Sequence, residues 1–111
     1  MRFDAFSFGS IQIDGLVYDH DVVIDRGVIR KRKKQRNAYG HTPLSAAEEI
    51  PWRCRQLVVG TGADGRLPVT QDVRRAAARR KIDLLIVPTA QAITTLQHDM
   101  DDTNAILHVT C

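Results

Sequence analysis

The sequence predicts one α/β domain of residues 1–111 with three layers: an N-terminal β-hairpin or meander, a central mixed sheet that contains a βαβ unit, and helices packed on that sheet. Three observations support this fold class. Turn dipeptides separate short apolar runs near the N-terminus, and a helical stretch lies between two apolar runs in the second half. A chain of 111 residues with 43% hydrophobic and 26% charged residues is typical of a single globular domain.

The N-terminal third alternates between apolar runs and turns. Residues 11–13 read apolar-polar-apolar, and Asp14-Gly15 tolerates the positive φ of a two-residue hairpin turn. Residues 16–24 are expected to return as one longer strand. Residues 25–27 are a second turn signal before a third strand begins at Val28. This order of strands and turns predicts an antiparallel meander.

A short helix is expected in the middle of the chain. Thr42-Pro43 precedes Ser45-x-x-Glu48, which is the pattern of a capping box at a helix N-terminus. Pro51 would stop this helix, because proline cannot donate the backbone hydrogen bond of a helix interior. The predicted helix is therefore about two turns long.

The second half predicts the βαβ unit. Residues 57–59 form a buried strand, residues 70–81 an amphipathic helix with Thr70 as cap, and residues 83–87 a nearly continuous apolar strand of the kind covered on both faces. The two strands are expected to be parallel neighbours with a right-handed crossover. Thr89 then caps a helix that runs to about residue 97, and residues 105–109 form the last strand.

The glycine-rich loop after the first of these strands is a candidate ligand site. It is no dinucleotide fingerprint, because Pro68 delays the next helix to about Thr70. Its N–H groups and a guanidinium would suit a carboxylate or phosphate. The alternative is a tight turn whose glycines satisfy positive φ, and a lone motif of this kind favours the turn. The candidate ligand-binding residues, with Thr89 at the end of the neighbouring strand, are Thr61, Gly62, Asp64, Gly65, Arg66 and Thr89.

A basic segment follows the third predicted strand. Six of the seven residues 30–36 are basic, against sixteen Lys and Arg in the chain. We expect the segment at the surface, either as a solvated edge that discourages edge-to-edge pairing or as a site for an acidic protein or an anionic membrane. Sequence-specific nucleic-acid binding is not expected, since no reading helix and no aromatic platform accompany the charges. The candidate partner surface consists of Arg30, Lys31, Arg32, Lys33, Lys34 and Arg36.

The chain offers no catalytic or metal site that its sequence makes visible. His108 and Cys111 would point to opposite faces of a strand, and so would consecutive residues among Asp19, His20 and Asp21. The four histidines and two cysteines lack ligand spacing. No cofactor is expected. Reduced cysteines, no apolar leader and no membrane-length apolar run predict a cytoplasmic protein without a transmembrane segment.

Several short motifs together resemble a known family. They are Ser7-Phe8-Gly9-Ser10-Ile11, His20-Asp21-Val22-Val23-Ile24, Gly40-His41, Gly60-Thr61-Gly62, Gly65-Arg66-Leu67, Pro88-Thr89 and His108-Val109-Thr110-Cys111. The chain resembles a small domain family of unknown function typified by a methanogen structural-genomics protein, which includes mitochondrial respiratory complex I assembly factor 3 and the adipogenesis-associated domain protein. The resemblance implies a three-layer α/β fold, no established enzymatic activity and a role in assembly.

Three functional hypotheses follow. The first is a non-enzymatic protein-interaction or assembly module with a protein partner. The second is a small-ligand or anion-binding protein that uses the crevice of the glycine-rich loop, and the sequence leaves open whether it also catalyses a reaction. Weak nucleic-acid association through the basic segment is a third. The sequence leaves the partner's identity and a homo-oligomer open.

Overall fold

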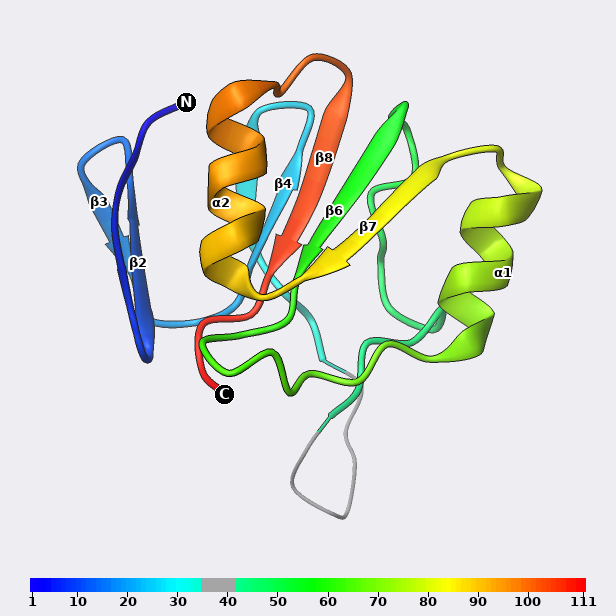
Figure 1. Cartoon of the computed structure of the whole chain (residues 1–111), viewed down its shortest axis with the longest axis horizontal. Helices are drawn as coiled ribbons and strands as arrows, with labels where there is room; N and C mark the ends of the chain where they lie inside the picture. Colours follow the sequence, from blue (N-terminus) through cyan, green and yellow to red (C-terminus); the bar gives the residue numbers. More distant parts are fainter. Residues whose placement is uncertain (35–41) are drawn as a thin grey trace.

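Two β-sheets and two helices make up the computed structural model, which describes residues 1–34 and 42–111 (Figure 1). The smaller sheet has the strand order β1-β2-β3, and the larger has the order β5-β4-β8-β6-β7. The elements are β1 (Phe3–Ser7), β2 (Ser10–Ile13), β3 (Leu16–Tyr18), β4 (Val22–Asp25), β5 (Val28–Lys31), β6 (Gln56–Gly60), α1 (Gln71–Arg79), β7 (Asp83–Val87), α2 (Thr89–His98) and β8 (Thr103–Leu107).

The N-terminal turns form hairpins, but the strand predicted over residues 16–24 is wrong. The chain leaves the small sheet after β3 and enters the large sheet at β4. Leu16 and Val17 are exposed in β3, whereas residues 22–24 of β4 are all buried. An inner strand covered on both faces buries every side chain. Residues 22–24 suit such a strand, whereas residues 16–18 suit the more exposed small sheet. The first strand, β1, was not among the elements predicted from the sequence.

The βαβ unit is confirmed. β6 and β7 are parallel neighbours with Val58 opposite Leu85, and α1 connects them. The helix buries Val73, Ala76 and Ala77.

β7 is the outer strand of the sheet, and its residues 84–87 are half-buried. Leu85 and Val87 pack against one core, and Leu84 and Ile86 pack against the other, so the strand is covered on both faces as expected. The strand whose residues are all fully buried is β8 in the centre.

β8 begins and ends two residues earlier than residues 105–109, the range that the sequence predicts. It pairs in parallel with β6 and antiparallel with β4. Residues 108–111 therefore leave the sheet, and their side chains no longer follow the alternation of a strand.

The helix predicted from Ser45 is also wrong. Residues 45–50 contain a turn at 46–47 and a bend at 48 but no helix, and Leu44 makes an isolated parallel bridge to Val69. Its N–H donates to the Pro68 carbonyl at 2.9 Å, and its own carbonyl accepts from the Thr70 N–H at 3.0 Å. A two-turn helix is marginal on its own, so these tertiary hydrogen bonds decide the local structure.

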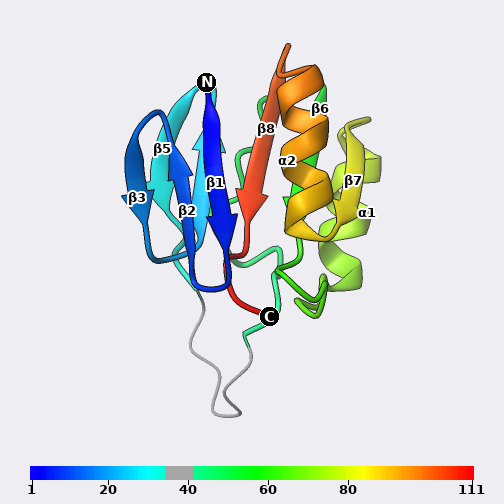
Figure 2. The same cartoon turned by 60° about the vertical axis from the view of Figure 1, so that its left-hand side comes forward.

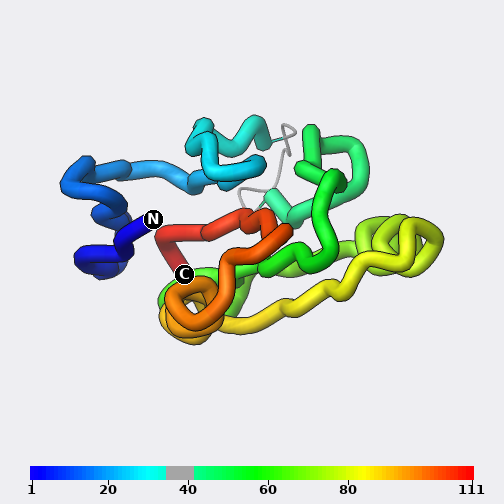
Figure 3. The backbone as a smooth tube through the Cα atoms, turned by 90° about the horizontal axis from the view of Figure 1, so that it is seen from above, coloured from blue at the N-terminus to red at the C-terminus, as the bar shows by residue number. Residues whose placement is uncertain are grey.

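The large sheet separates two apolar cores. The small sheet and α2 pack on one face around Ile13, Val58 and Leu96. α1 and residues 44–54 cover the other face around Leu57 and Val73. Figures 2 and 3 show α2 and the segment after residue 42 on opposite sides of the sheet, which is the predicted three-layer arrangement. Neither of the two helices in the described ranges is long and apolar enough to cross a membrane.

Candidate functional site

Polar residues gather at one edge of the large sheet, where the three parallel strands end. β6 leads into the glycine-rich loop, β7 into α2, and β8 into the C-terminal residues 108–111 (Figure 1). β4 begins at this edge because it runs antiparallel to β8, so Asp21 lies beside the same strand ends. The carboxyl ends of parallel strands are where open α/β sheets place their ligands.

The glycine-rich loop and Thr89 meet at this edge, as the sequence predicts, but their polar groups bind each other. The Gly62 N–H donates to Thr89 Oγ1 at 2.8 Å, and that hydroxyl donates to the His108 carbonyl at 2.6 Å. Thr89 is fully buried and Thr61 is 4% exposed. The hydroxyl of Thr89 therefore joins the glycine-rich loop to the backbone of His108 inside the protein.

The loop also holds the C-terminal segment. The Ala63 N–H donates to the Thr110 carbonyl at 2.7 Å, and the Arg66 N–H to the Cys111 carbonyl at 2.8 Å. The anion-binding alternative needs free N–H groups within residues 61–65, and the N–H of Ala63 is not free. Asp64, Gly65 and the side chain of Arg66 are exposed, so anion binding by the loop stays a prediction that rests on the guanidinium.

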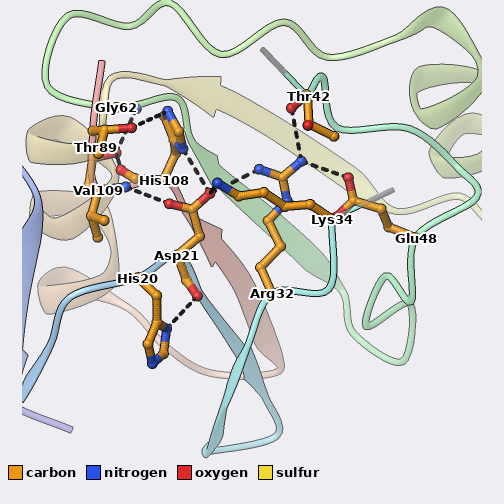
Figure 4. A network of polar contacts seen from close by, with 11 residues as sticks. His20, Asp21, Arg32, Lys34, Thr42, Glu48, Gly62, Thr89, His108 and Val109 are labelled. Atoms are coloured by element: carbon orange, nitrogen blue, oxygen red, sulfur yellow. Dashed lines mark hydrogen bonds and ion pairs between the residues drawn. The ribbon is translucent and has the colours of Figure 1, made fainter. Parts of the chain in front are cut away.

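Asp21 is the centre of a buried polar cluster (Figure 4). Its Oδ1 accepts from the Val109 N–H at 2.9 Å. Its Oδ2 accepts from Arg32 Nη1 at 2.9 Å and from His108 Nδ1 at 2.8 Å. The ammonium of Lys34 lies 3.7 Å from the same oxygen. Burial acts to raise the pKa of the Asp21 carboxyl, but the hydrogen bonds from His108, Val109 and Arg32 outweigh it and hold that pKa well below its usual range.

Arg32 is the cation inside this cluster. Its Nε and Nη2 donate to the two carboxylate oxygens of Glu48 at 2.8 and 2.6 Å, and Nη2 also donates to the Thr42 carbonyl at 3.2 Å. The residue is 4% exposed. Burial acts to lower the pKa of this guanidinium, yet its hydrogen bonds and ion pairs with Glu48 and Asp21 leave it raised. The prediction that Arg32 belongs to a surface patch is therefore wrong.

The other described residues of the basic segment are at or near the surface. Lys33 lies 3.6 Å from the Glu49 carboxylate, with both side chains exposed. Arg30 is partly buried and donates to the Glu49 carbonyl at 2.6 Å, and Lys31 is exposed on the outer strand β5. Arg36 lies outside the described residues.

His108 links the cluster to the C-terminus. Its Nδ1 donates to Asp21, whose ionised carboxylate only accepts. Its Nε2 lies 3.1 Å from the hydroxyl of Thr110. The imidazole is 8% exposed, whereas Thr110 is partly exposed. This chain of groups was not predicted from the sequence, because His108 was expected in a regular strand and Asp21 lies 87 positions away from it.

A cavity of about 400 Å³ opens beside the cluster. Val109 and Thr110 line it from the C-terminal segment, and Lys31 and Lys34 from the basic segment. His20 also lines it, with Nδ1 donating to the Asp21 carbonyl at 2.9 Å. Within residues 1–34 and 42–111 no three His, Cys, Asp or Glu side chains are grouped as metal ligands would be. The charged side chains around the cavity include two lysines that could contact an anionic molecule.

The stability of the protein is expected to decrease in acid because of Asp21. Its pKa is lower in the folded state than in the unfolded chain, so its stabilising contribution is complete above about pH 4 and is lost as the pH falls towards the folded-state pKa. The free energy of unfolding of the wild type and of Asp21→Asn is measured in urea from pH 5 downwards. The wild-type value should fall more steeply, and the two slopes should differ by up to about 1.4 kcal/mol per pH unit. Equal slopes for the two proteins would contradict this role of Asp21.

Comparison with known families and structures gives consistent results. The profile of the family described as "Protein of unknown function (DUF498/DUF598)" matches residues 3–106. The crystal structure of the conserved hypothetical protein PH1505 from Pyrococcus horikoshii is similar at 30% sequence identity, with 100% of both chains covered and a TM-score of 0.87.

Two further solved structures have the same fold. The structure described as MT938 is 27% identical, with 98% of this chain and 97% of that chain covered and a TM-score of 0.72. The solution structure of a Bordetella pertussis protein described as an Mth938-like domain is 17% identical, with 96% of this chain and 84% of that chain covered and a TM-score of 0.62. No curated protein matches the chain significantly.

Proposed function

The chain belongs to the DUF498/DUF598 family of proteins of unknown function, and we propose that it is a protein-interaction module whose outer strand β5 binds an acidic segment of a partner. The observation that carries the proposal is the position of β5. Among the described residues it is the last strand of the large sheet and pairs with β4 alone, which leaves its other edge without a neighbouring strand. An outer strand of this kind accepts an extended peptide as an additional strand.

The side chains of β5 support a partner of acidic character. Val28 is 67% exposed and offers an apolar contact. Lys31 is exposed, and Lys33 and Lys34 follow with their ammonium groups at the surface. Because Arg32 is used internally by Asp21 and Glu48, the proposed surface consists of Val28, Arg30, Lys31, Lys33 and Lys34. The assembly role that the family resemblance implies would use such a surface.

A triple variant tests this proposal. Lys31→Gln, Lys33→Gln and Lys34→Gln together should change the free energy of unfolding by less than about 0.5 kcal/mol per site, since the side chains are exposed. Binding of a partner captured from the native host should be lost, and wild-type binding should weaken as salt is added. The measurement is affinity capture with quantitative mass spectrometry at low and high ionic strength.

A matched control removes the same number of charges elsewhere. Arg74, Arg75 and Arg79 are exposed on α1, and their replacement by Gln should leave the captured partner unchanged. Partner binding that survives in the β5 variant at low ionic strength would contradict the proposal. If the captured partner is a second copy of the chain, sedimentation of the purified protein will show an oligomer that the β5 variant loses.

A further inference from the structure

The C-terminal segment places a hydroxyl, an imidazole and a carboxylate in one line of hydrogen bonds. Thr110 Oγ1 lies 3.1 Å from His108 Nε2, and His108 Nδ1 lies 2.8 Å from Asp21 Oδ2. We infer that Thr110 is a nucleophile activated by His108, and that the site transfers acyl groups from small esters or thioesters that carry a negative charge. This goes beyond the proposed binding surface and does not depend on it.

The hydrogen of the neutral imidazole lies on the nitrogen that faces Asp21, and this leaves the nitrogen that faces Thr110 able to act as a base. The ionised carboxylate of Asp21 can only accept, so the Nδ1 position carries a hydrogen. In the neutral imidazole the Nε2 position then has the lone pair and accepts the hydrogen of the Thr110 hydroxyl. A nucleophile and a base within hydrogen-bond distance, with the base oriented by a third group, are the signature of an activated hydroxyl.

The surroundings hold this geometry in place. Asp21 cannot turn away from His108, because the Val109 N–H and the Arg32 guanidinium bind its two oxygens. The segment itself is fixed by the Ala63 N–H, which donates to the Thr110 carbonyl at 2.7 Å. His108 is 8% exposed and Asp21 is 3% exposed, so both side chains are held within the fold. Thr110 and Asp21 both line the cavity, whereas His108 lies behind them and does not.

The cavity explains the choice of substrate. Thr110 shares it with Lys31, Lys34 and Asp19, and its volume of about 400 Å³ suits a small molecule. The Lys34 ammonium lies 3.7 Å from Asp21 Oδ2 and is 47% exposed, so it can reach a negative charge in the cavity. One lysine would stabilise the oxyanion that forms on the acyl group, and the other would bind an anionic substituent of the substrate.

The reaction balances without a cofactor. Thr110 Oγ1 forms a bond to the acyl carbon while its hydrogen passes to His108 Nε2. The bond from the acyl carbon to the leaving oxygen or sulfur then breaks, and the imidazolium returns the proton to the leaving group. Water attacks the acyl-threonine with the same histidine as base, which releases the acid and restores the hydroxyl. The net reaction converts an ester and water into an acid and an alcohol, or a thioester and water into an acid and a thiol.

The experiment uses mono-4-nitrophenyl succinate, which is anionic, and 4-nitrophenyl acetate, which is neutral. The wild-type protein should release nitrophenolate faster than buffer does, with a preference for the succinate. Thr110→Val should lower this rate by at least about 100-fold, the smallest effect usual for a lost acid–base or nucleophilic group. Thr110→Ser should restore it. Thr94→Val makes the same change at an exposed threonine of α2 and should have the wild-type rate.

Peptide mapping of the quenched reaction distinguishes Thr110 from other nucleophiles. The succinyl group should be found on Thr110 in the wild-type protein. Circular dichroism of Thr110→Val should match the wild type, so that its loss of rate is not a loss of fold. A wild-type rate equal to buffer with both esters, an unchanged rate in Thr110→Val, or acylation confined to Cys111 or lysines would each overturn the inference.

Discussion

Arg32→Met is expected to decrease the free energy of unfolding by about 3–5 kcal/mol, which is the usual effect of removing one partner from a buried ion pair. The guanidinium binds both oxygens of Glu48 and one of Asp21, and the side chains of all three residues are almost fully buried. Without it two carboxylates are left in the interior with no arginine to neutralise them. Methionine has a similar length, so the loss of apolar packing is small.

Urea unfolding at neutral pH measures this effect. Lys33→Met is a matched control, because Lys33 is the next residue, carries the same charge and has a 72% exposed side chain. The control should change the free energy of unfolding by less than about 0.5 kcal/mol. A decrease below about 1 kcal/mol for Arg32→Met would show that the buried pairing contributes little to stability.

Gly62→Val is expected to have the other large effect. Gly62 has a φ of +104°, and a Cβ atom there would lie 2.6 Å from the Thr110 carbonyl oxygen and 2.8 Å from His108 Cδ2. The backbone conformation alone costs a β-branched residue about 1–3 kcal/mol. The overlap adds to this, because the Thr110 oxygen belongs to backbone that the Ala63 N–H holds in place. The C-terminal segment must move away for valine to fit.

Gly27→Val separates the two contributions. Gly27 has a φ of +81°, but a Cβ atom there would meet nothing within 4 Å. Its replacement should cost only the conformational strain, so thermal unfolding should show a smaller loss than for Gly62→Val. Equal losses for the two variants would mean that close contact with residues 108–111 does not constrain the loop.

The part of the fold that the sequence predicts well is the part with clear periodicity. The strand around Val58, the helix that buries Val73 and the strand around Leu85 each show a regular apolar pattern, and the structure joins them as a parallel unit. The predictions that failed depend on tertiary contacts. Leu44 bonds to residues 68 and 70 in place of a helix, and residues 16–24 divide between two sheets.

The polar cluster could not be found from spacing. Asp21, Arg32 and Glu48 come from three separate segments, and only the turn structure after Leu44 brings Glu48 to the guanidinium. In the sequence Arg32 is one basic residue in a run of five, with nothing to distinguish it from Lys31 or Lys33. The usable signals were two motifs that the family resemblance picked out without indicating their contacts, His20-Asp21-Val22-Val23-Ile24 and His108-Val109-Thr110-Cys111.

The central claim is that the basic segment is divided between a structural arginine, which joins Asp21 to Glu48, and exposed lysines, which we propose bind a partner. A double-mutant cycle of Asp21→Asn and Arg32→Met, measured by urea unfolding at neutral pH, tests the structural half most directly. Arg32 Nη1 lies 2.9 Å from Asp21 Oδ2. We therefore expect the double variant to be more stable, by about 1–3 kcal/mol, than the sum of the two single losses implies. Losses that add to within about 0.5 kcal/mol would contradict the claim.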